Sequence, residues 1–252
     1  MPGSIRRIPA GLVSTVVALL VWQLVGSVGP LAGDSFATAS EAIVALVGLF
    51  ADPDFWLAVL ETLEMAIIGF ALSMVIAVPL GLLIGLSRFS YRSTKFTFDF
   101  FKVIPPIVLI PIAILVIGPS ITMGVALIVF ANVFAVAIQT AYGVRDADPV
   151  LLETMRCYRM NVFQQIRYAR LPSAAVQLAI AARIAAAASL IVAVVAGLVG
   201  GAPGLGSLLS RYQTAGTADR TYAVVLVLGI LGILTSRLIV RLQRRVIFWS
   251  GR

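Results

Sequence analysis

The side chains that most often carry out chemistry are scarce in this sequence, and those present do not form a catalytic set. The chain has no histidine and a single cysteine, Cys157, so it lacks the commonest metal ligand and general base and cannot form an intrachain disulfide. Glu61 and Glu64 lie within one helical turn of each other, as paired acids in a glycosidase can. No soluble cleft or aromatic platform for a sugar accompanies them, so we expect solvated carboxylates, no catalytic residue and no metal site.

The most informative pattern is the polar segment 144–172, which interrupts an otherwise apolar chain. Asp148 followed by Pro149 predicts a helix start, because aspartate accepts hydrogen bonds from free backbone amides and proline fits the first helical position. Asn161 predicts a second start, and Gln164 is placed three residues later to reach back as in a capping box. We therefore expect two short helices joined by a tight turn.

Both predicted helices are amphipathic, with an apolar ridge and a charged rim. In the first helix, Leu152 and Met155 belong to the ridge, and Glu153 and Arg156 belong to the rim. The second helix is expected to stop at residues 171–172, because the residue before a proline is pushed away from helical geometry. An apolar ridge with a charged rim suits contact with another protein, although a solvated connector is the alternative.

A set of motifs in fixed order links this segment to a known family. The segment carries Glu153-Thr154-Met155, then Arg159, then Ala169-Arg170-Leu171-Pro172. This order resembles the EAA signature of permease subunits in bacterial ABC importers. The proline-rich stretch Lys102–Pro111 and the turn Gly204-Leu205-Gly206 are similar to those of the nitrate/sulfonate/taurine-type branch, and the likeness runs from about Leu60 to Trp249.

The sequence departs from the family pattern at four positions. Thr154 and Met155 replace two alanines, and Gly197 stands where many members carry an acidic residue. Arg159 stands where the family has glycine, and a turn residue with positive φ costs a non-glycine side chain roughly 1 kcal/mol.

The resemblance implies a single transmembrane permease domain, residues 1–252, in which residues 144–172 form a cytoplasmic coupling loop that docks on an ATPase. The docking residues expected from it and from the apolar ridge are Leu152, Glu153, Thr154, Met155, Arg156, Arg159, Leu171 and Pro172. The implied partners are a second copy of the permease, two ATP-binding subunits and an extracytoplasmic substrate-binding protein. ATP and Mg would bind the ATPase, because this chain contains no G-x-x-x-x-G-K-[ST] motif and is expected to bind no cofactor.

Composition independently places the chain in a membrane. Hydrophobic residues make up 60% of it, charged residues only 12%, and the mean hydropathy is +1.04, whereas soluble domains are nearer one quarter charged. The net charge of +8 does not indicate nucleic-acid binding, because the basic residues are scattered between apolar runs instead of gathering on one face. We expect lipid as the surroundings and no nucleic-acid partner.

The apolar runs predict an all-α integral membrane protein with about six transmembrane helices and a type I ABC importer permease fold. The expected spans are 9–28, 59–86, 96–117, 121–142, 173–200 and 221–240, with a surface helix at 40–50 and an outer loop at 201–220. A cleaved signal peptide is the alternative for the first run. Of 19 Lys and Arg residues, Arg211 and Arg220 fall outside, Arg183 falls deep within a span, and the remaining 16 lie on the inside or at its margin, so both termini are expected in the cytoplasm of a bacterial inner membrane.

Polar or broken positions inside the spans are candidates for a translocation route. Pro105 and Pro106 remove backbone donors and must bend or break the third span, and broken membrane helices are tolerated where they line a cavity or are buried in protein. Asn132 and Gln139 share a face of the fourth span, and Arg183 is expected near mid-membrane, about 16 Å along its helix from the proline at 172. Bonds between neighbouring helices are the alternative role for all three polar side chains.

The expected function is that of an importer permease for a small anionic organic solute, such as a sulfonate, taurine, nitrate or an aromatic acid. The chain itself is expected not to be an enzyme. The alternative is a secondary carrier or channel without ATP, which would need intramembrane acids for ion coupling. Acids are scarce at the centres of the predicted spans, which argues against this alternative.

Overall fold

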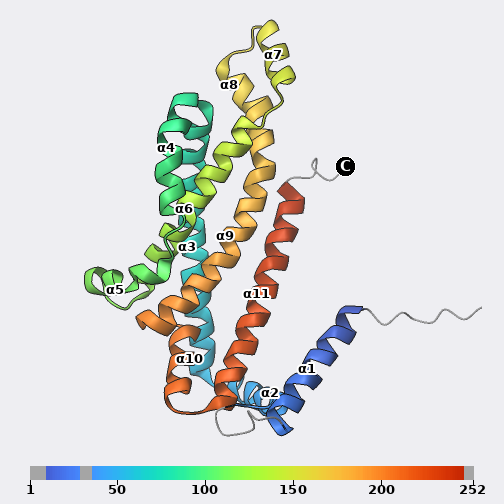
Figure 1. Cartoon of the computed structure of the whole chain (residues 1–252), viewed down its shortest axis with the longest axis vertical. Coiled ribbons are helices and arrows are strands. Elements are labelled where there is room, and N and C mark those ends of the chain that lie inside the picture. Colours follow the sequence, from blue (N-terminus) through green and yellow to red (C-terminus); the bar gives the residue numbers. More distant parts are fainter. Residues whose placement is uncertain (1–9, 29–35, 247–252) are drawn as a thin grey trace, which may run out of the picture.

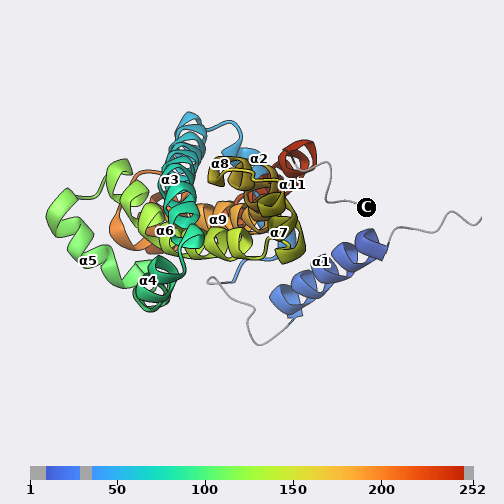
Figure 2. The same cartoon turned by 90° about the horizontal axis from the view of Figure 1, so that it is seen from above.

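The computed structural model describes residues 10–28 and 36–246, which fold into an elongated bundle of helices (Figure 1). Arg6 and Arg7, which precede the first predicted span, lie outside the described residues. The helices are α1 (Ala10–Val28), α2 (Ala39–Leu49), α3 (Pro53–Leu86), α4 (Arg88–Phe101), α5 (Pro106–Ile117), α6 (Ile121–Arg145), α7 (Pro149–Cys157), α8 (Val162–Gln165), α9 (Leu171–Gly200), α10 (Leu205–Thr214) and α11 (Ala218–Val246). Seen from above, α3, α6 and α9 form the centre, and α1 stands apart from it (Figure 2).

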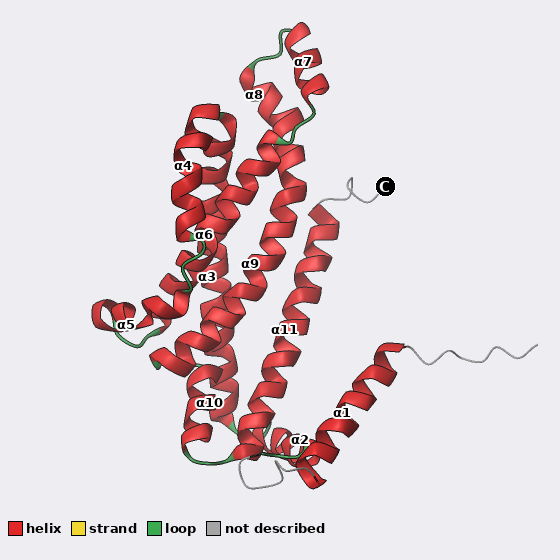
Figure 3. Ribbon diagram, viewed as in Figure 1, coloured by secondary structure: helices red, strands yellow, loops and turns green. Residues whose placement is uncertain are grey.

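The regular elements of the described residues are helices, so the predicted all-α fold is confirmed (Figure 3). Four helical stretches are long and apolar enough to cross a membrane, namely α3, α6, residues Val162–Gly200 and most of α11. The pair α4 and α5 passes the same test as one broken span. The first predicted span, 9–28, corresponds to α1, whose 19 residues reach about 28 Å, close to the roughly 30 Å of a hydrocarbon core.

The third span, predicted over 96–117 with a bend or a break at its prolines, is broken. The residues before this span, which include Arg88, Arg92 and Lys95, are already helical as part of α4. The helix then ends, and after residues 102–105 the chain turns by 82° into α5. Pro105 caps α5 and Pro106 occupies its first turn. Neither residue has an amide hydrogen, so both are accommodated at a helix start, whereas the interior of a continuous helix would lose two hydrogen bonds.

The predicted helix stop at Leu171-Pro172 is wrong. A π-helical turn at Ile166–Arg170 joins α8 to α9, and Val162–Gly200 forms one continuous stretch of 39 residues. In the wider turn the Leu171 N–H donates to the Ile166 carbonyl, five residues earlier. A wider turn displaces the backbone carbonyls that would otherwise clash with a proline ring. This displacement explains how the first turn of α9 accommodates Pro172.

The outer loop expected at 201–220 contains a helix, α10. Gly204 precedes it with φ of 123°, a left-handed conformation that favours glycine. The buried Leu205 N–H donates to Thr62 Oγ1 of α3 at 2.8 Å, which ties the start of α10 to the bundle. The helix predicted at 40–50 is confirmed as α2, which Thr38 caps through a capping box with Glu41.

Small residues let α9 occupy the centre of the bundle, as its alanine content predicts. Ala181 and Ala185 are buried against α3 and α6, and Ala193 and Ala196 are buried in a second cluster with Met65 and other residues of α3, α5 and α6. A third cluster, built around Phe55, Leu205 and Val224, holds α3, α10 and α11 together. Close packing through small side chains is typical of helices inside a membrane bundle.

Candidate functional site

The helices α7 and α8 form a hairpin that extends beyond the other helices at one end of the bundle (Figure 1). Its two starts follow the predicted caps: Asp148 Oδ1 accepts from the Val150 N–H at 2.8 Å, and Asn161 and Gln164 form a reciprocal capping box. The sequence therefore predicted the local construction of the hairpin correctly. Local capping depends on residues within one turn of each other, which is why it can be inferred from sequence.

The turn between α7 and α8 is a Schellman motif built around Arg159. The Met160 N–H donates to the Met155 carbonyl at 2.9 Å, and the Arg159 N–H donates to the Arg156 carbonyl at 2.9 Å. Arg159 has φ of 54°, the one positive φ among the described non-glycine residues. The arginine that departs from the family pattern thus adopts the left-handed conformation for which glycine is preferred.

The predicted docking residues differ in how exposed they are and in which element holds them. Met155 is only 6% exposed, so it stabilises the hairpin from within instead of offering a free surface. Leu152 is half-buried, whereas Glu153, Thr154, Arg156 and Arg159 are exposed. Leu171 and Pro172 lie at the start of α9, after the π turn.

Apolar side chains outside the predicted set cover the hairpin surface. Tyr158 is 80% exposed and Phe163 is 72% exposed, and Val150, Leu151 and Val162 are exposed beside them in sequence. Contiguous exposed apolar residues outside a bilayer mark a contact surface. We call these five residues the hairpin ridge. The amphipathic pattern of the sequence predicts that an apolar ridge exists, but it does not predict which of the ridge residues are buried inside the hairpin.

The candidate route residues Asn132 and Gln139 both bond to α9. The buried Asn132 Nδ2 donates to Ser189 Oγ at 2.9 Å and approaches the Ala185 carbonyl at 3.4 Å. Gln139 Nε2 donates to Gln177 Oε1 at 2.8 Å. Both amides therefore hold α6 against α9, the alternative role that the sequence left open.

Arg183 contacts α11 near that helix's C-terminal end. Its Nη2 donates to Gln243 Oε1 at 2.7 Å, and Gln243 in turn donates to the Ala179 carbonyl of α9. Gln243 is the last residue of the candidate span in α11. Arg183 is thus level with one end of the α11 span, and its contact is a link between helices.

Pro106 lines an apolar groove of about 190 Å³ between α5, α6 and α9, whereas Pro105 is exposed at the break. The groove is otherwise formed by Ile107, Ile110, Leu127, Ile191, Val192 and Val195. Asn132, Gln139 and Arg183 are not among the residues that line this groove. A role for these residues in solute passage stays a prediction.

A second feature near the hairpin was not found from the sequence. Glu153 and Arg156 line a cleft with Arg88, Arg145 and Arg170, which come from widely separated parts of the chain. In the sequence, Arg88, Arg145 and Arg170 each lie near the end of an apolar run, which indicates membrane topology and not a shared site. Their convergence depends on how α3, α6 and α9 pack.

Comparisons with known proteins relate most of the chain to transport permeases. The family model described as "Binding-protein-dependent transport system inner membrane component" matches residues 77–248. The chain is 24% identical to the putative aliphatic sulfonates transport permease protein SsuC of Bacillus subtilis, covering 96% of this chain and 87% of the relative. It is 22% identical to the nitrate import permease protein NrtB of Synechocystis, covering 93% and 88%, and 27% identical to the bicarbonate transport system permease protein CmpB of Synechococcus elongatus, covering 91% and 86%.

Solved structures show the same arrangement of helices. A chain of the MetNI methionine ABC transporter in an inward-facing conformation matches with a TM-score of 0.68 and 25% identity, covering 77% of this chain and 98% of that chain. A bacterial ABC transporter involved in the import of the acidic polysaccharide alginate matches with a TM-score of 0.62 and 14% identity, covering 94% and 96%. The second likeness concerns the fold alone.

Proposed function

Because the chain belongs to the family of binding-protein-dependent transport system inner membrane components, we propose that it forms the solute path of an ATP-driven importer for a small anion. It is an ABC importer permease of the nitrate/sulfonate type and a multi-pass inner-membrane protein. The observation that carries the proposal is the family match over 77–248, which includes the hairpin of α7 and α8 as well as α6 and α9.

The proposed partners follow from this membership. An ATP-binding subunit supplies the energy, because the chain has no phosphate-binding loop motif of its own. An extracytoplasmic binding protein delivers the solute, and a second copy of the permease completes the path. We place the hairpin and both termini in the cytoplasm, because the end that carries the hairpin also carries most of the basic residues.

The hairpin is the proposed docking element for the ATPase. Its ridge supplies large apolar side chains, and its rim supplies Glu153, Arg156 and Arg159, which are exposed. Aromatic side chains contribute a large share of the energy of protein interfaces, so Tyr158 and Phe163 are the proposed anchors. Met155 supports them from inside the hairpin.

Docking is tested by truncating the proposed anchors. The permease is co-expressed with the ATP-binding subunit proposed as its partner, and Tyr158→Ala and Phe163→Ala are compared with Phe89→Ala. Phe89 is 80% exposed on α4, outside the hairpin. Each hairpin variant should lose about 2 kcal/mol of association, measured as weaker co-purification and lower solute-stimulated ATP hydrolysis, while membrane insertion stays normal.

The outcomes separate docking from a loss of folding. If both hairpin variants co-purify and hydrolyse ATP as the unmodified permease does, the docking role is refuted. If Phe89→Ala weakens the complex as much as they do, the effect is not specific to the hairpin. A thermal unfolding measurement on each variant shows whether the permease itself remains folded.

The proposed solute is a small organic or inorganic anion. The relatives are named for aliphatic sulfonates, nitrate and bicarbonate, which share a single compact negative charge. Calorimetry on the partner binding protein with taurine, an alkane sulfonate, nitrate and a benzoate tests this class directly. Tight binding of a cation or a neutral sugar, with none of the anions bound, would contradict it.

A further inference from the structure

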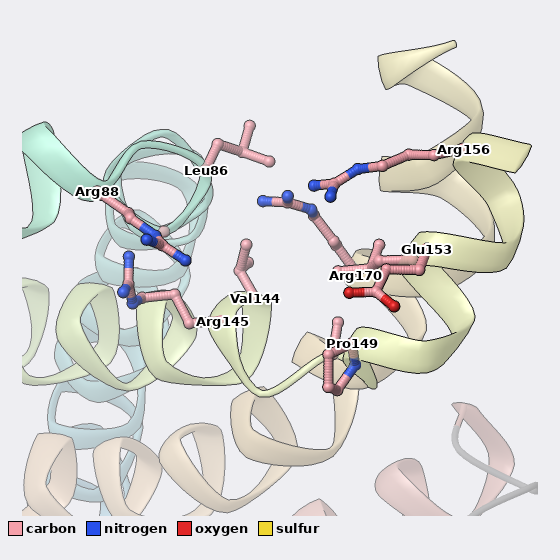
Figure 4. A pocket seen from close by; sticks show the side chains of 11 residues that line it. Leu86, Arg88, Val144, Arg145, Pro149, Glu153, Arg156 and Arg170 are labelled. Atoms are coloured by element: carbon pink, nitrogen blue, oxygen red, sulfur yellow. The ribbon is translucent and has the colours of Figure 1, made fainter. Parts of the chain in front are cut away.

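The cleft beside the hairpin lies where four parts of the chain meet. It has a volume of about 350 Å³ and is bordered by the end of α3, the end of α6, the hairpin and the π turn. Figure 4 shows Arg88 and Arg145 on one side and Arg156 and Arg170 on the other, with the side chains of Arg88, Arg156 and Arg170 extending towards the space between them and that of Arg145 turned away from it. The cleft is therefore a convergence of positive charge from four separate segments.

The positive charge of the cleft is not balanced by the side chains that line it. Glu153 is the one acidic residue in the lining. The ion pairs formed by the described residues both involve Asp99 of α4, so none of the four arginines has a carboxylate within 4.0 Å in that part of the chain. Asp148, which lies close in sequence, caps α7.

Holding four like charges around one space costs free energy unless an anion occupies it. Like charges around one space repel one another, although water and salt screen this repulsion at Arg88, Arg145 and Arg156, which are exposed. Arg145 is also held in place, because its guanidinium lies 4.4 Å from the centre of the Tyr91 ring. The arrangement is thus partly preorganised.

We propose that this cleft binds one tetrahedral oxyanion, a phosphate or sulfate group, between its two pairs of arginines. The guanidinium group is planar and presents paired N–H donors, which match the oxygens of such an anion. The cleft is bordered by Gly85 and Leu86 at the end of one candidate span and by Val144 at the end of another. A phosphate at this level can belong to a lipid headgroup or can be free in solution, and the chemistry of recognition is the same.

The inference does not depend on the ATPase, so it is tested on the purified full-length permease alone. One sample is titrated calorimetrically with inorganic phosphate and with sulfate in detergent at low ionic strength. Another is placed in nanodiscs of phosphatidylcholine containing phosphatidylglycerol, and native mass spectrometry measures the anionic lipid that stays bound. The first arm detects the free anion, and the second detects the headgroup.

The decisive variant is R88Q combined with R170Q, which removes one arginine from each side. Neither residue is among the proposed docking residues. The matched control is R237Q combined with R241Q, which removes the same charge from exposed positions on α11. Because each charge-assisted hydrogen bond to arginine is worth a factor of about ten in affinity, the cleft variant should bind at least about tenfold more weakly in one arm, and the control should not.

A variant that is expected to strengthen anion binding completes the test. E153Q removes the carboxylate that competes for the arginines, so it should strengthen binding several-fold. Loss in the R88Q/R170Q variant with a gain in E153Q supports the proposal and identifies the source by the arm in which it occurs. Absence of binding in both arms, or equal loss in the R237Q/R241Q control, overturns it. So does a result in which only co-purification with the ATPase falls, because the cleft would then receive acidic side chains of that protein.

Discussion

At the scale of single residues, Arg159 shows how a departure from a family pattern is absorbed. The Schellman turn requires a left-handed residue at this position, and the chain supplies an arginine at φ of 54°. The two turn hydrogen bonds are nevertheless formed. The strain is therefore confined to one backbone position and leaves the hairpin geometry unchanged.

Arg159→Gly should stabilise the turn by up to about 1 kcal/mol, because glycine adopts a positive φ without steric cost. The measurement is hydrogen exchange at the Met160 amide, which bonds to the Met155 carbonyl and should exchange up to about fivefold more slowly. Arg156→Gly is the control of opposite sign, because glycine inside α7 should speed exchange. Faster exchange in Arg159→Gly would show that the arginine side chain stabilises the turn.

A second residue-scale prediction concerns Thr62. Its hydroxyl oxygen accepts the buried Leu205 N–H, so Thr62→Val leaves a buried donor without an acceptor and should cost about 1–3 kcal/mol of stability. Thr140→Val is the matched control, because the Thr140 hydroxyl donates to the Val136 carbonyl within its own helix. Thermal unfolding in detergent should show a larger loss for Thr62→Val, and equal losses would refute the role of this hydrogen bond.

Residue-scale features were predictable where neighbours in sequence decide them. The caps at Asp148 and Asn161 depend on the next few residues, and both were found. The burial of Met155 and the convergence of Arg88 with Arg170 depend on tertiary packing, and neither was found. A periodic pattern reports that a helix has an apolar face, but it does not report what covers that face.

At the scale of elements, the contact of α3 with α6 depends on close approach of the two backbones. A methyl group at Gly81 would meet the Ala137 carbonyl and lie 2.6 Å from Thr140 Cβ. The two helices therefore fit at a separation that only glycine allows at this position.

Gly81→Ala should destabilise the protein by about 1–3 kcal/mol, because the added methyl group overpacks the contact between α3 and α6. Gly229→Ala on α11 is the control: a methyl group there meets nothing within 4 Å, so the substitution should be neutral or gain up to about 1 kcal/mol from helix propensity. Thermal unfolding of both variants in the same detergent decides the matter. Similar melting temperatures would mean that the helices can separate without cost.

The proline signals illustrate what an element-scale prediction can contain. Pro105 and Pro106 were expected to bend or break a span, and the break is real, because a missing amide hydrogen disrupts any helix. Pro172 was expected to end a helix, but the π turn before it keeps the helix continuous. Sequence therefore indicates where a helix is disturbed, whereas the response depends on the neighbouring turn.

At the scale of the whole molecule, the hairpin and α10 lie at opposite ends of the bundle (Figure 1). The sequence predicted this separation from the alternation of spans and the positions of basic residues. It did not predict which helices touch, because apolar runs of similar composition carry no information about their partners.

Labelling of intact cells with a membrane-impermeant maleimide tests the orientation. The single cysteine, Cys157, is exposed on α7 and should be protected from reagent added outside. Gln213→Cys combined with Cys157→Ser places a thiol on the exposed end of α10, which should react. Permeabilised cells provide the control in which Cys157 becomes reactive, and labelling of Cys157 in sealed cells would reverse the orientation.

The unbroken stretch Val162–Gly200 has a mechanical consequence. Its 39 residues correspond to a rod about 58 Å long, which begins in the hairpin and ends next to the turn that leads into α10. A rod of this length that tilts by about 10° about one end moves its other end by about 10 Å. The π turn is the one place along it where the hydrogen-bond register changes, so it can serve as the joint of a lever that links the two sides of the membrane.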